Sequence, residues 1–584
     1  MSKSKTMTRR EFVKAAGAGI FLAGVHFAIP LPAWAGSAGN GIRGASPRRR
    51  YDLSIGYSPI EIDGRQATAT AVNGSVPGPL VHLREGDDIV LNVTNRLMDT
   101  EHSSIHWHGI LVPFPMDGVP GVNFEGIRPG ETYEYRYRVK QAGTYWYHSH
   151  SRFQEQTGSY GPLVIDPKDG EPFAYDRDYP VVLSDWSFED PEAIFRNINL
   201  EGHYYNFQQR TVWDFFDDVG ERGFEDTVAA RMAWGKMRMS PVDLADVTGH
   251  TYTYLMNGHS PSMNWTALFT PGETIRLRFI NASTTTNYDV RIPGLDMEVV
   301  MADGKAVRPV VVHEFRIGVA ETYDVLVRPG KDRAYTLFAE SLDRSGYTRG
   351  TLAPELGLEA PVPALRPRPV RRLQDIGMGG MAHGAMGGKS QRNMTHDSEP
   401  MSQDDRIPGP NGPAPFKPEG NRSNVAMVVM NPRYRLDEPG IGIGDDGWKV
   451  LTYDDLVSTE PQPYAGTVDR EMTINITANM ERYMFSFDGK KFSEHPGPYL
   501  FRHNERLRLF LVNHTMMEHP IHLHGMWMQL ENGADKAPFK HTVLTKPGEV
   551  LSALITPIEK GDWAFHCHLL YHMEAGMFQV VRVA

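Results

Sequence analysis

The chain has 584 residues, a formal net charge of −11 at neutral pH and one cysteine, Cys567. The acidic surplus argues against a nucleic-acid partner and against an anionic membrane surface. One cysteine excludes an intramolecular disulfide, and a chain of this length exceeds a single hydrophobic core, so about three domains are expected.

The N-terminal 35 residues are typical of an export signal. Residues 8–14, TRREFVK, form a twin-arginine pattern, an apolar stretch follows over 15–32, and residues 33–35, AWA, fit a small-x-small cleavage site. The alternative is an uncleaved membrane anchor, but the glycines, two prolines and His26 of the stretch make a poor spanning helix. We therefore predict removal of residues 1–35 and export by the twin-arginine route into the periplasm, an oxidising compartment.

Short, alternating apolar segments bounded by Gly, Pro, Asn and Asp dominate the rest of the chain, and this pattern is typical of β-strands. Residues 181–186, VVLSDW, and 274–281, TIRLRFIN, are examples. Helical patterns are confined to short pieces such as 222–236. The sequence therefore predicts an all-β protein.

One strand pattern occurs three times, at 86–95, 272–281 and 504–513, and each copy ends at an asparagine. The first and third copies lead into a His-x-His pair, whereas the middle copy leads into 284–288, TTTNY. An internal repeat indicates repeated units. We infer that the first and third units share a metal cluster and that the middle unit is a spacer.

These patterns predict three consecutive Greek-key β-sandwich domains at 48–168, 169–350 and 426–584. Residues 351–425 lie between the second and third domains and are rich in Pro, Gly, Met and charge. Their early part, PVPALRPRPVRR, predicts a stiff, extended connector.

The middle of this connector is rich in methionine. Thioethers select Cu(I), and a glycine-rich loop offers methionine no core to fill. We predict a transient Cu(I) site there, at Met378, Met381, His383 and Met386. The alternative is a plain linker whose methionines are open to oxidation.

Histidines recur in four His-x-His pairs, namely His106/His108, His148/His150, His522/His524 and His566/His568. On a strand, residues i and i+2 face the same side about 7 Å apart, so each pair can reach two metals of one cluster. The first two pairs are 40 residues apart and the last two are 42 apart. Imidazole alone suits copper, zinc, iron and nickel.

The only cysteine lies between His566 and His568. Because side chains alternate across a strand, Cys567 is expected to face away from these two histidines. Two histidines, a cysteine and a weak axial methionine form a blue-copper site. Cys567, His572 and Met577 supply three of these ligands, and His519 is the candidate for the fourth.

The motifs around these histidines resemble, in order, the four motifs of the multicopper oxidase family. They are HWHG (106–109), GTYWYHSH (143–150), HPIHLHG (519–525) and HCHLLYHMEAGM (566–577). A narrower resemblance is to the bacterial copper-resistance oxidases, and it is carried by SPVDLADVTGHTYTYLMNG (240–258), WKVLTYDDL (448–456) and NHTMMEHPIHLHG (513–525).

The resemblance implies cupredoxin-like domains and four copper ions. The type 1 copper would be held by His519, Cys567, His572 and the axial Met577. The type 2 copper would be held by His106 and His522, and the type 3 pair by His108, His148, His150, His524, His566 and His568. Asp117, nine residues after His108, matches the family's acidic residue beside the trinuclear site and is expected to deliver protons. Its alternative role is that of a turn residue before Gly118.

The acidic positions depart from the family in one place. Some relatives have an acidic residue directly after the second type 1 histidine, where this chain has Met573 and then Glu574. On a strand, a one-residue shift reverses the face, so Glu574 is left out of the site unless the chain is helical or bulged there. Glu518, beside His519, would either guide cations or be a solvated charge.

The resemblance implies an oxidase that takes single electrons at Cys567 and reduces O2 to two waters with four of them. We expect Cu(I) as the reductant, in periplasmic copper resistance, with phenols or Fe(II) as incidental substrates and a monomeric chain. The alternatives are a laccase-like phenol oxidase and a non-catalytic copper-sequestering protein. A copper nitrite reductase would not need the third and fourth His-x-His pairs.

Overall fold

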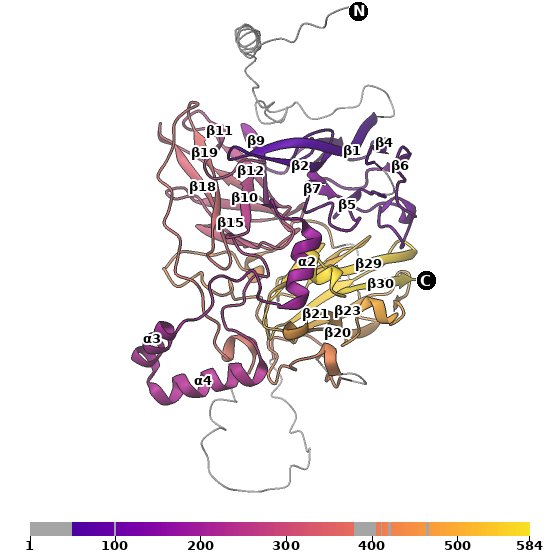
Figure 1. Ribbon diagram of the computed structural model, residues 1–584. Helices are drawn as coiled ribbons and strands as arrows, with labels where there is room; N and C mark the ends of the chain where they lie inside the picture. Colours follow the sequence, from indigo (N-terminus) through magenta and orange to yellow (C-terminus); the bar gives the residue numbers. More distant parts are fainter. Residues whose placement is uncertain (1–48, 99–100, 379–404, 410–411, 419–421, 463–465) are drawn as a thin grey trace, which may run out of the picture.

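A computed structural model describes residues 49–584 except 99–100, 379–404, 410–411, 419–421 and 463–465. The expected export signal lies outside the described residues, as do Met381, His383 and Met386 of the expected Cu(I) site. The described chain folds into three consecutive pairs of β-sheets (Figure 1).

The first pair consists of two four-stranded sheets with the orders β2-β1-β4-β6 and β3-β8-β7-β5. Their strands are β1 (Arg49–Ile62), β2 (Arg65–Val72), β3 (Val81–Arg84), β4 (Asp88–Asn95), β5 (His106–His108), β6 (Thr132–Arg138), β7 (Gly143–His148) and β8 (Tyr160–Asp166).

The second pair consists of a six-stranded sheet, β10-β9-β12-β17-β14-β15, and a five-stranded sheet, β11-β19-β18-β13-β16. The strands are β9 (Arg177–Ser187), β10 (Tyr252–Met256), β11 (Trp265–Leu268), β12 (Ile275–Asn281), β13 (Tyr288–Arg291), β14 (Met297–Ala302), β15 (Lys305–Val312), β16 (Glu314–Ile317), β17 (Thr322–Val327), β18 (Tyr335–Ser341) and β19 (Tyr347–Ala353).

The third pair has as many strands as the second. It consists of a six-stranded sheet, β21-β20-β23-β28-β25-β26, and a five-stranded sheet, β22-β30-β29-β24-β27. The strands are β20 (Arg470–Asn479), β21 (Met484–Phe487), β22 (Tyr499–Phe501), β23 (Leu507–Asn513), β24 (His519–Leu523), β25 (Met528–Leu530), β26 (Phe539–Lys540), β27 (Thr542–Thr545), β28 (Val550–Ile555), β29 (Gly561–Cys567) and β30 (Phe578–Val583).

The three copies of the sequence repeat form equivalent strands. β4, β12 and β23 each pair in parallel with the first long strand of their own sheet pair, β1, β9 and β20 respectively. Each then pairs antiparallel with a later strand, β6, β17 or β28. The repeat therefore marks one topological position in all three units, and the all-β prediction is confirmed.

The asparagine that ends each copy explains why the pattern stops there. Asn95, Asn281 and Asn513 are fully buried. Each side-chain amide donates to one backbone carbonyl of the following loop and to one much further along the chain, for example from Asn513 to Met517 (2.8 Å) and Thr545 (3.2 Å). Each side-chain oxygen accepts from the backbone N–H two residues further on. The asparagine thus satisfies loop backbone groups that the sheet leaves unpaired.

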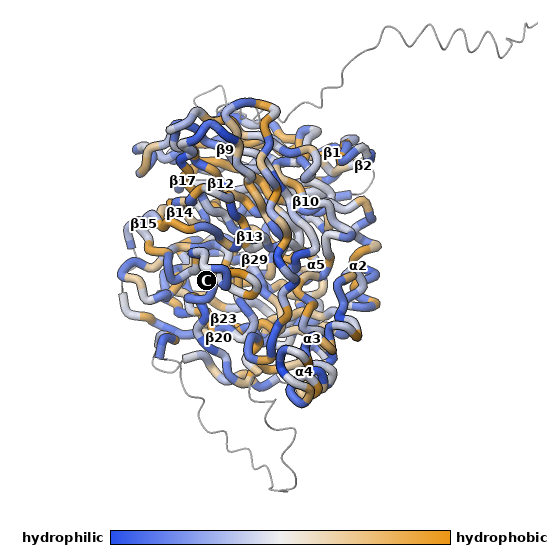
Figure 2. The backbone as a smooth tube through the Cα atoms, turned by 90° about the vertical axis from the view of Figure 1, so that its left-hand side faces the viewer, coloured by the Kyte–Doolittle hydropathy of each residue, from blue (hydrophilic) through white to orange (hydrophobic). Residues whose placement is uncertain are grey.

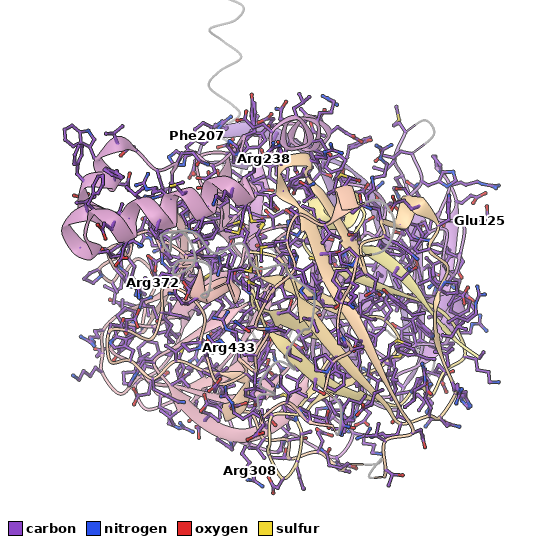
Figure 3. All side chains as sticks on the ribbon, turned by 90° about the horizontal axis from the view of Figure 1, so that it is seen from below. Glu125, Phe207, Arg238, Arg308, Arg372 and Arg433 are labelled. Carbon is purple, nitrogen blue, oxygen red and sulfur yellow. The ribbon has the colours of Figure 1, made fainter. Side chains whose placement is uncertain are left out.

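Helices are few within the described residues. α2 (Pro191–Leu200), α3 (Val212–Arg222) and α4 (Phe224–Met237) come from the second unit, and α5 (Leu570–Glu574) lies near the C-terminus. α3 and α4 form the lower end of the molecule in Figures 1 and 2. Arg238, labelled in Figure 3 at the end of α4, donates to Glu481 of the third unit at 2.7 Å. The longest described helix has 14 residues, and none of the described helices has the length and apolar character that crossing a bilayer requires.

The three sheet pairs pack against one another through buried side chains. β7 of the first pair lies against β12 and β17 of the second. There Thr144 donates to Asp324 (2.9 Å) and accepts from Arg278 (2.9 Å). A single cluster of buried apolar residues runs through the second and third units, and a separate one fills the first. The first and third units meet through their histidine-bearing strands.

Candidate metal centre

The four His-x-His pairs lie on or at the end of four strands, and the two halves of the molecule place them alike. In the first unit β5 pairs antiparallel with β7, so that His106 lies opposite His148. In the third unit β24 pairs antiparallel with β29, so that His522 lies opposite His566. The similar spacings of the two halves in the sequence therefore correspond to the same antiparallel strand pairing in the first and third units, with the first histidine of one pair opposite the first histidine of the next.

Strand alternation separates the histidines from the residues between them. Trp107 is fully buried in the core of the first unit, whereas Leu523 and Cys567 belong to the core of the second and third units. The histidines face the space between the first and third units. Their arrangement follows from the two-residue period of a β-strand.

Eight imidazoles gather where the two units meet, and we call them the histidine cluster: His106, His108, His148, His150, His522, His524, His566 and His568. The rings of His106 and His524 are 4.0 Å apart between centroids, and those of His108 and His522 are 3.9 Å apart. These two contacts cross from the first unit to the third. The cluster exists only when the two units are docked.

Within the cluster, three-histidine groups have ligand atoms within 4.8 Å of one another. One group is His108, His148 and His568, and another is His150, His524 and His566. His106 forms a third group with His522 and His524. Each of these groups combines residues of the first and third units, so metal ions bound there would join the two.

Backbone carbonyls fix the tautomers of several of these rings. Nδ1 of His106 lies 2.7 Å from the Asp117 carbonyl, Nδ1 of His522 lies 2.8 Å from the His541 carbonyl, and Nδ1 of His566 lies 2.9 Å from the Cys567 carbonyl. A carbonyl oxygen only accepts, so Nδ1 carries the proton and Nε2 keeps its lone pair. Nε2 of His566 lies 3.1 Å from Nε2 of His524, which brings two imidazole nitrogens to one point.

Asp117 contacts two members of the cluster. Its carbonyl binds His106, and its carboxylate oxygen Oδ2 lies 2.9 Å from Nδ1 of His524. Asn123 donates to the same carboxylate at 3.0 Å. Asp117 also ends the short helix η1 (Phe114–Met116) and precedes Gly118 at a φ of 87°. It is therefore both a turn residue and the carboxylate next to the cluster.

Glu155 is a second buried carboxylate beside the cluster, and the sequence did not single it out. Its Oε2 lies 2.7 Å from Nδ1 of His148, and the side chain is buried. Burial, with a smaller contribution from the charge of Asp185, raises the pKa of Glu155 well above its usual value. A small cavity of about 10 Å³ is lined by Glu155 and by four histidines of the cluster. Glu155 lies in the loop after β7, where no spacing signal marks it.

Cys567 and two more histidines form a separate group, which we call the thiolate site: His519, Cys567, His572 and Met577. The Cys567 Sγ lies 3.5 Å from Nδ1 of His519 and 3.8 Å from Nδ1 of His572, and the two nitrogens are 3.2 Å apart. Met577 is fully buried, and its carbonyl accepts from the Cys567 N–H at 3.1 Å. All four residues predicted from the sequence therefore lie together.

The outer nitrogens of the two thiolate-site histidines face polar side chains. Nε2 of His519 lies 2.7 Å from the Thr515 hydroxyl, and Nε2 of His572 lies 2.9 Å from Oδ2 of Asp246. Asp246 belongs to the second unit and is buried. It lies within residues 240–258, which carried the narrower resemblance, but nothing in their spacing indicated a contact with His572.

Burial dominates the electrostatics of both groups. It lowers the pKa of most of the cluster histidines, and that of His566 to about 4. It lowers the pKa of His519 and raises the pKa of the Cys567 thiol. A metal ion requires neutral imidazoles and a deprotonated thiol, so the histidines are already in the binding form and a bound metal would displace the thiol proton.

The chain is helical just after the thiolate site, which corrects the assumption of a strand around Glu574. α5 spans Leu570–Glu574, and the Glu574 side chain is exposed. Met573 instead lines the small cavity that contains Glu155 and four cluster histidines. Glu574 therefore faces solvent, and the reason is the turn of a helix and not the alternation of a strand.

Glu518 is neither a solvated charge nor a free guide for cations. It is buried and forms an ion pair with Arg371, which is also buried. Both side chains line a cavity of about 720 Å³ that also contains Arg372, Arg435 and Lys546. Met378, the described member of the expected Cu(I) set, is buried in the apolar core.

The donor atoms of both groups fit copper. Within the described residues, Nε2 of His106, His148, His522 and His568 is buried and has no hydrogen-bond partner. Burying a nitrogen without a hydrogen-bond partner costs folding free energy. A metal ion bound between these imidazoles would give each nitrogen a partner and so explain the arrangement. The thiolate site adds the sulfur and two histidines that copper–thiolate centres use.

Comparison with known proteins decides the family. Models described as multicopper oxidase match residues 54–170, 177–355 and 467–584. The chain belongs to the multicopper oxidase family. These three matches fall on the three sheet pairs.

Two relatives resemble this multicopper oxidase over nearly their whole length. It is 50% identical to a copper resistance protein A homolog of Pseudomonas syringae pv. tomato, over 99% of each chain. It is 47% identical to copper resistance protein A of Escherichia coli, again over 99% of each chain.

Solved structures support the fold. Fet3p, described as a multicopper oxidase that functions in iron import, matches with a TM-score of 0.61 and 18% identity, over 91% of this chain and 90% of that one. A laccase from Botrytis aclada matches with a TM-score of 0.59 and 19% identity, over 93% and 88%. The three units are thus consecutive cupredoxin-like domains, and copper is the cofactor of this enzyme family.

Proposed function

We propose that this multicopper oxidase holds four copper ions. The thiolate site binds the type 1 copper through His519, Cys567, His572 and Met577. His106 and His522 bind the type 2 copper. The remaining six cluster histidines bind the type 3 pair in the two groups described above, His108/His148/His568 and His150/His524/His566.

One observation carries this proposal: Cys567 belongs to the thiolate site while its chain neighbours belong to the histidine cluster. The Cys567 sulfur lies among His519 and His572. His566 and His568 belong to the two different groups assigned to the type 3 pair. The backbone from Cys567 to these histidines is a short covalent route for electrons. A protein that only stored copper would not need it.

We propose that the reaction couples one-electron oxidation of Cu(I) to four-electron reduction of O2 to two waters, in periplasmic copper resistance. The two copper resistance relatives favour this substrate over phenols or Fe(II). Bound copper supplies the redox chemistry, and the protein supplies ligands, fixed tautomers and access. Export by the twin-arginine route and a monomeric state belong to the same proposal.

Asp117 is proposed to pass protons to the cluster. Its carboxylate lies against Nδ1 of His524, and its backbone carbonyl fixes the tautomer of His106. A small cavity of about 10 Å³ beside His106 and His524 shares Leu111 and Met526 with a cavity of about 260 Å³. This pair of cavities offers water and O2 a path toward the cluster.

We also propose that the functional division follows the domains predicted from the sequence. The domains at 48–168 and 426–584 share the trinuclear site, and the domain at 169–350 binds no copper. The middle domain has Thr284, Thr285 and Thr286 at the position of the histidine pairs. Their backbone and hydroxyl groups hydrogen-bond to Asp185 instead, for example from the Thr286 hydroxyl at 2.7 Å.

The deciding experiment is oxygen uptake by the copper-loaded protein with chelator-buffered Cu(I) as the only reductant. A phenol is tested in parallel, and the Cys567→Ser variant serves as the control. Rapid uptake with Cu(I), lost in the variant, supports the cuprous oxidase. Faster uptake with the phenol than with Cu(I) favours the laccase-like alternative. No uptake above the control with either reductant, despite full copper loading, overturns the proposal in favour of sequestration.

A further inference from the structure

Glu155 reaches the histidine cluster from the loop between β7 and β8 of the first domain. It is only 3% exposed. Its Oε2 lies 2.7 Å from Nδ1 of His148, which is buried as well. Because both partners are buried, salt screens this contact far less than it screens one at the surface. The proposed copper assignment gives this carboxylate no role.

The surroundings of His148 decide which of its nitrogens carries the proton. Nδ1 also lies 3.1 Å from the Ser149 carbonyl oxygen. A carbonyl only accepts, so Nδ1 carries the proton and Nε2 keeps its lone pair. Nε2 is buried and has no hydrogen-bond partner within the described residues. Glu155 therefore contacts the outer side of a ring whose other nitrogen is free for a metal.

Asp117 makes the same kind of contact with another cluster histidine. Its Oδ2 lies 2.9 Å from Nδ1 of His524. His524 and His148 belong to the two different groups assigned to the type 3 pair. Each group thus has one histidine whose Nδ1 faces a buried carboxylate, and both carboxylates come from the first domain.

The cavity beside Glu155 offers no substitute for it. Leu570 and Met573 of α5 are part of the wall of this cavity of about 10 Å³. Glu155 is the only carboxylate among the described residues that line it, and its Oε1 has no hydrogen-bond partner among them. No other acidic side chain of this wall can take over the contact with His148.

We propose that Glu155 is a positioning residue of the type 3 pair and the counterpart of Asp117. Its carboxylate holds the His148 ring so that Nε2 is directed toward His108 and His568. This inference rests on the proposed copper assignment. Carboxylates and carbonyls that bind the outer nitrogen of a metal-ligating histidine fix the tautomer and the orientation of its ring.

The position of His148 matters for retention of one copper. Its group takes His108 and His148 from the first domain and only His568 from the third. If the His148 ring turns away, a copper in this group keeps two of its three imidazoles. Partners that orient ligand histidines typically contribute about 10- to 100-fold to metal affinity. Removal of the Glu155 carboxylate should therefore weaken the binding of this copper.

The test compares the copper-loaded protein with the variants Glu155→Leu and Glu155→Gln. Leucine fills a similar space and removes the acceptor, whereas glutamine keeps a carbonyl oxygen that accepts from Nδ1. The matched control is Glu201→Leu, because Glu201 lies 3.0 Å from Nε2 of His203 and both side chains are about half exposed, outside the proposed copper sites. Copper content is followed during dialysis against a chelator, and paramagnetic coppers are counted by electron paramagnetic resonance.

We expect Glu155→Leu to lose one copper at least about tenfold faster than the parent protein. Loss of one member of the coupled pair uncovers the other, so the number of paramagnetic coppers should rise by one while the near-ultraviolet absorption of the pair falls. Glutamine should restore both readouts, and Glu201→Leu should match the parent protein. Unchanged visible absorption of the thiolate site reports intact folding.

Equal rates of copper loss and equal paramagnetic counts in Glu155→Leu and the parent protein would overturn the inference. A defect in Glu155→Gln as large as that in Glu155→Leu would also overturn it, because an acceptor would then not be enough. So would loss of the visible absorption in Glu155→Leu, since Glu155 would then support the fold as a whole. Failure of the copper assignment is distinct, because the parent protein itself would then lack the absorption of the coupled pair.

Discussion

The thiolate site and the histidine cluster hold their imidazoles in opposite ways. In the thiolate site Nδ1 of His519 and of His572 faces the sulfur, and Nε2 lies beside the Thr515 hydroxyl in one ring and beside the Asp246 carboxylate in the other. In the cluster Nδ1 of His106, His522 and His566 is bound by backbone carbonyls, so Nε2 faces inward.

The two centres also differ in where their residues come from. The four thiolate-site residues lie within residues 519–577, and Asp246 reaches His572 from the second domain. The cluster takes half of its histidines from the first domain and half from the third. A centre built within one domain depends on local folding, whereas the cluster also depends on domain docking. The two should therefore respond differently to the same kinds of substitution.

The largest effect is expected for Cys567→Ser. Serine removes the only thiolate, at which the backbone route between the two centres begins, while leaving the cluster histidines in place. We expect loss of the visible copper–thiolate absorption and a fall in oxygen uptake of at least about a thousandfold, with the cluster coppers retained. Absorption, copper content and oxygen uptake measure this. Loss of the cluster coppers as well would contradict the independence of the two centres.

Asp117→Asn should have the next largest effect. Asparagine keeps the backbone contact with His106 and a polar contact with His524, but it removes the carboxylate. We expect oxygen uptake to fall about 10- to 100-fold at unchanged copper content.

The control for Asp117→Asn is Asp166→Asn. Asp166 contacts a histidine at a similar distance, 2.8 Å from His82, but is far more exposed than Asp117. This variant should leave oxygen uptake unchanged. Equal activity in the two variants would remove Asp117 from proton delivery.

Asp246→Asn should have a smaller effect, confined to the thiolate site. The carboxylate 2.9 Å from Nε2 of His572 favours the more positive, oxidised copper. Its removal should raise the reduction potential of this copper by several tens of millivolts, since 59 mV corresponds to a tenfold change for one electron. Redox titration of the visible absorption measures the shift.

The control for Asp246→Asn is Asp243→Asn. Asp243 is a neighbouring carboxylate that binds Asn206 (2.6 Å) and Gln209 (3.1 Å) and no copper ligand. A potential shift of equal size in this variant would mean that the general loss of negative charge, and not contact with His572, sets the potential.

The difference between the centres also explains what the sequence could predict. Side chains alternate across a strand with a period of two. Spacing alone therefore predicted that the two histidines of each His-x-His pair share one face and that Cys567 points to the opposite face from His566 and His568. The three-fold repeat likewise predicted one strand position in each domain, ending at Asn95, Asn281 and Asn513.

What could not be predicted are contacts that single residues make with the two centres. Asp246, Glu155 and His541 each reach a centre from a loop or strand end, without a partner at a fixed spacing in the sequence. Their roles depend on tertiary packing, which no local pattern encodes. The helix at 570–574 was missed for a related reason, since a five-residue helix is too short to show a period.

Acidification should destabilise the copper-free protein. The activity of the copper-loaded enzyme should hardly depend on pH near neutrality. Burial lowers the pKa of His566 to about 4, below the usual value of about 6.5. Between these two values the unfolded chain binds a proton that the folded chain does not, so stability falls as pH falls from about 6.5 to about 4. Each such histidine contributes up to about 1.4 kcal/mol per pH unit to the free energy of unfolding.

The unfolding temperature of the copper-free protein should thus depend less steeply on pH in His566→Gln than in the parent protein. It should keep its slope in His503→Gln, which changes an exposed histidine near the C-terminal domain surface. Equal slopes in both variants would show that acid sensitivity does not arise from the cluster.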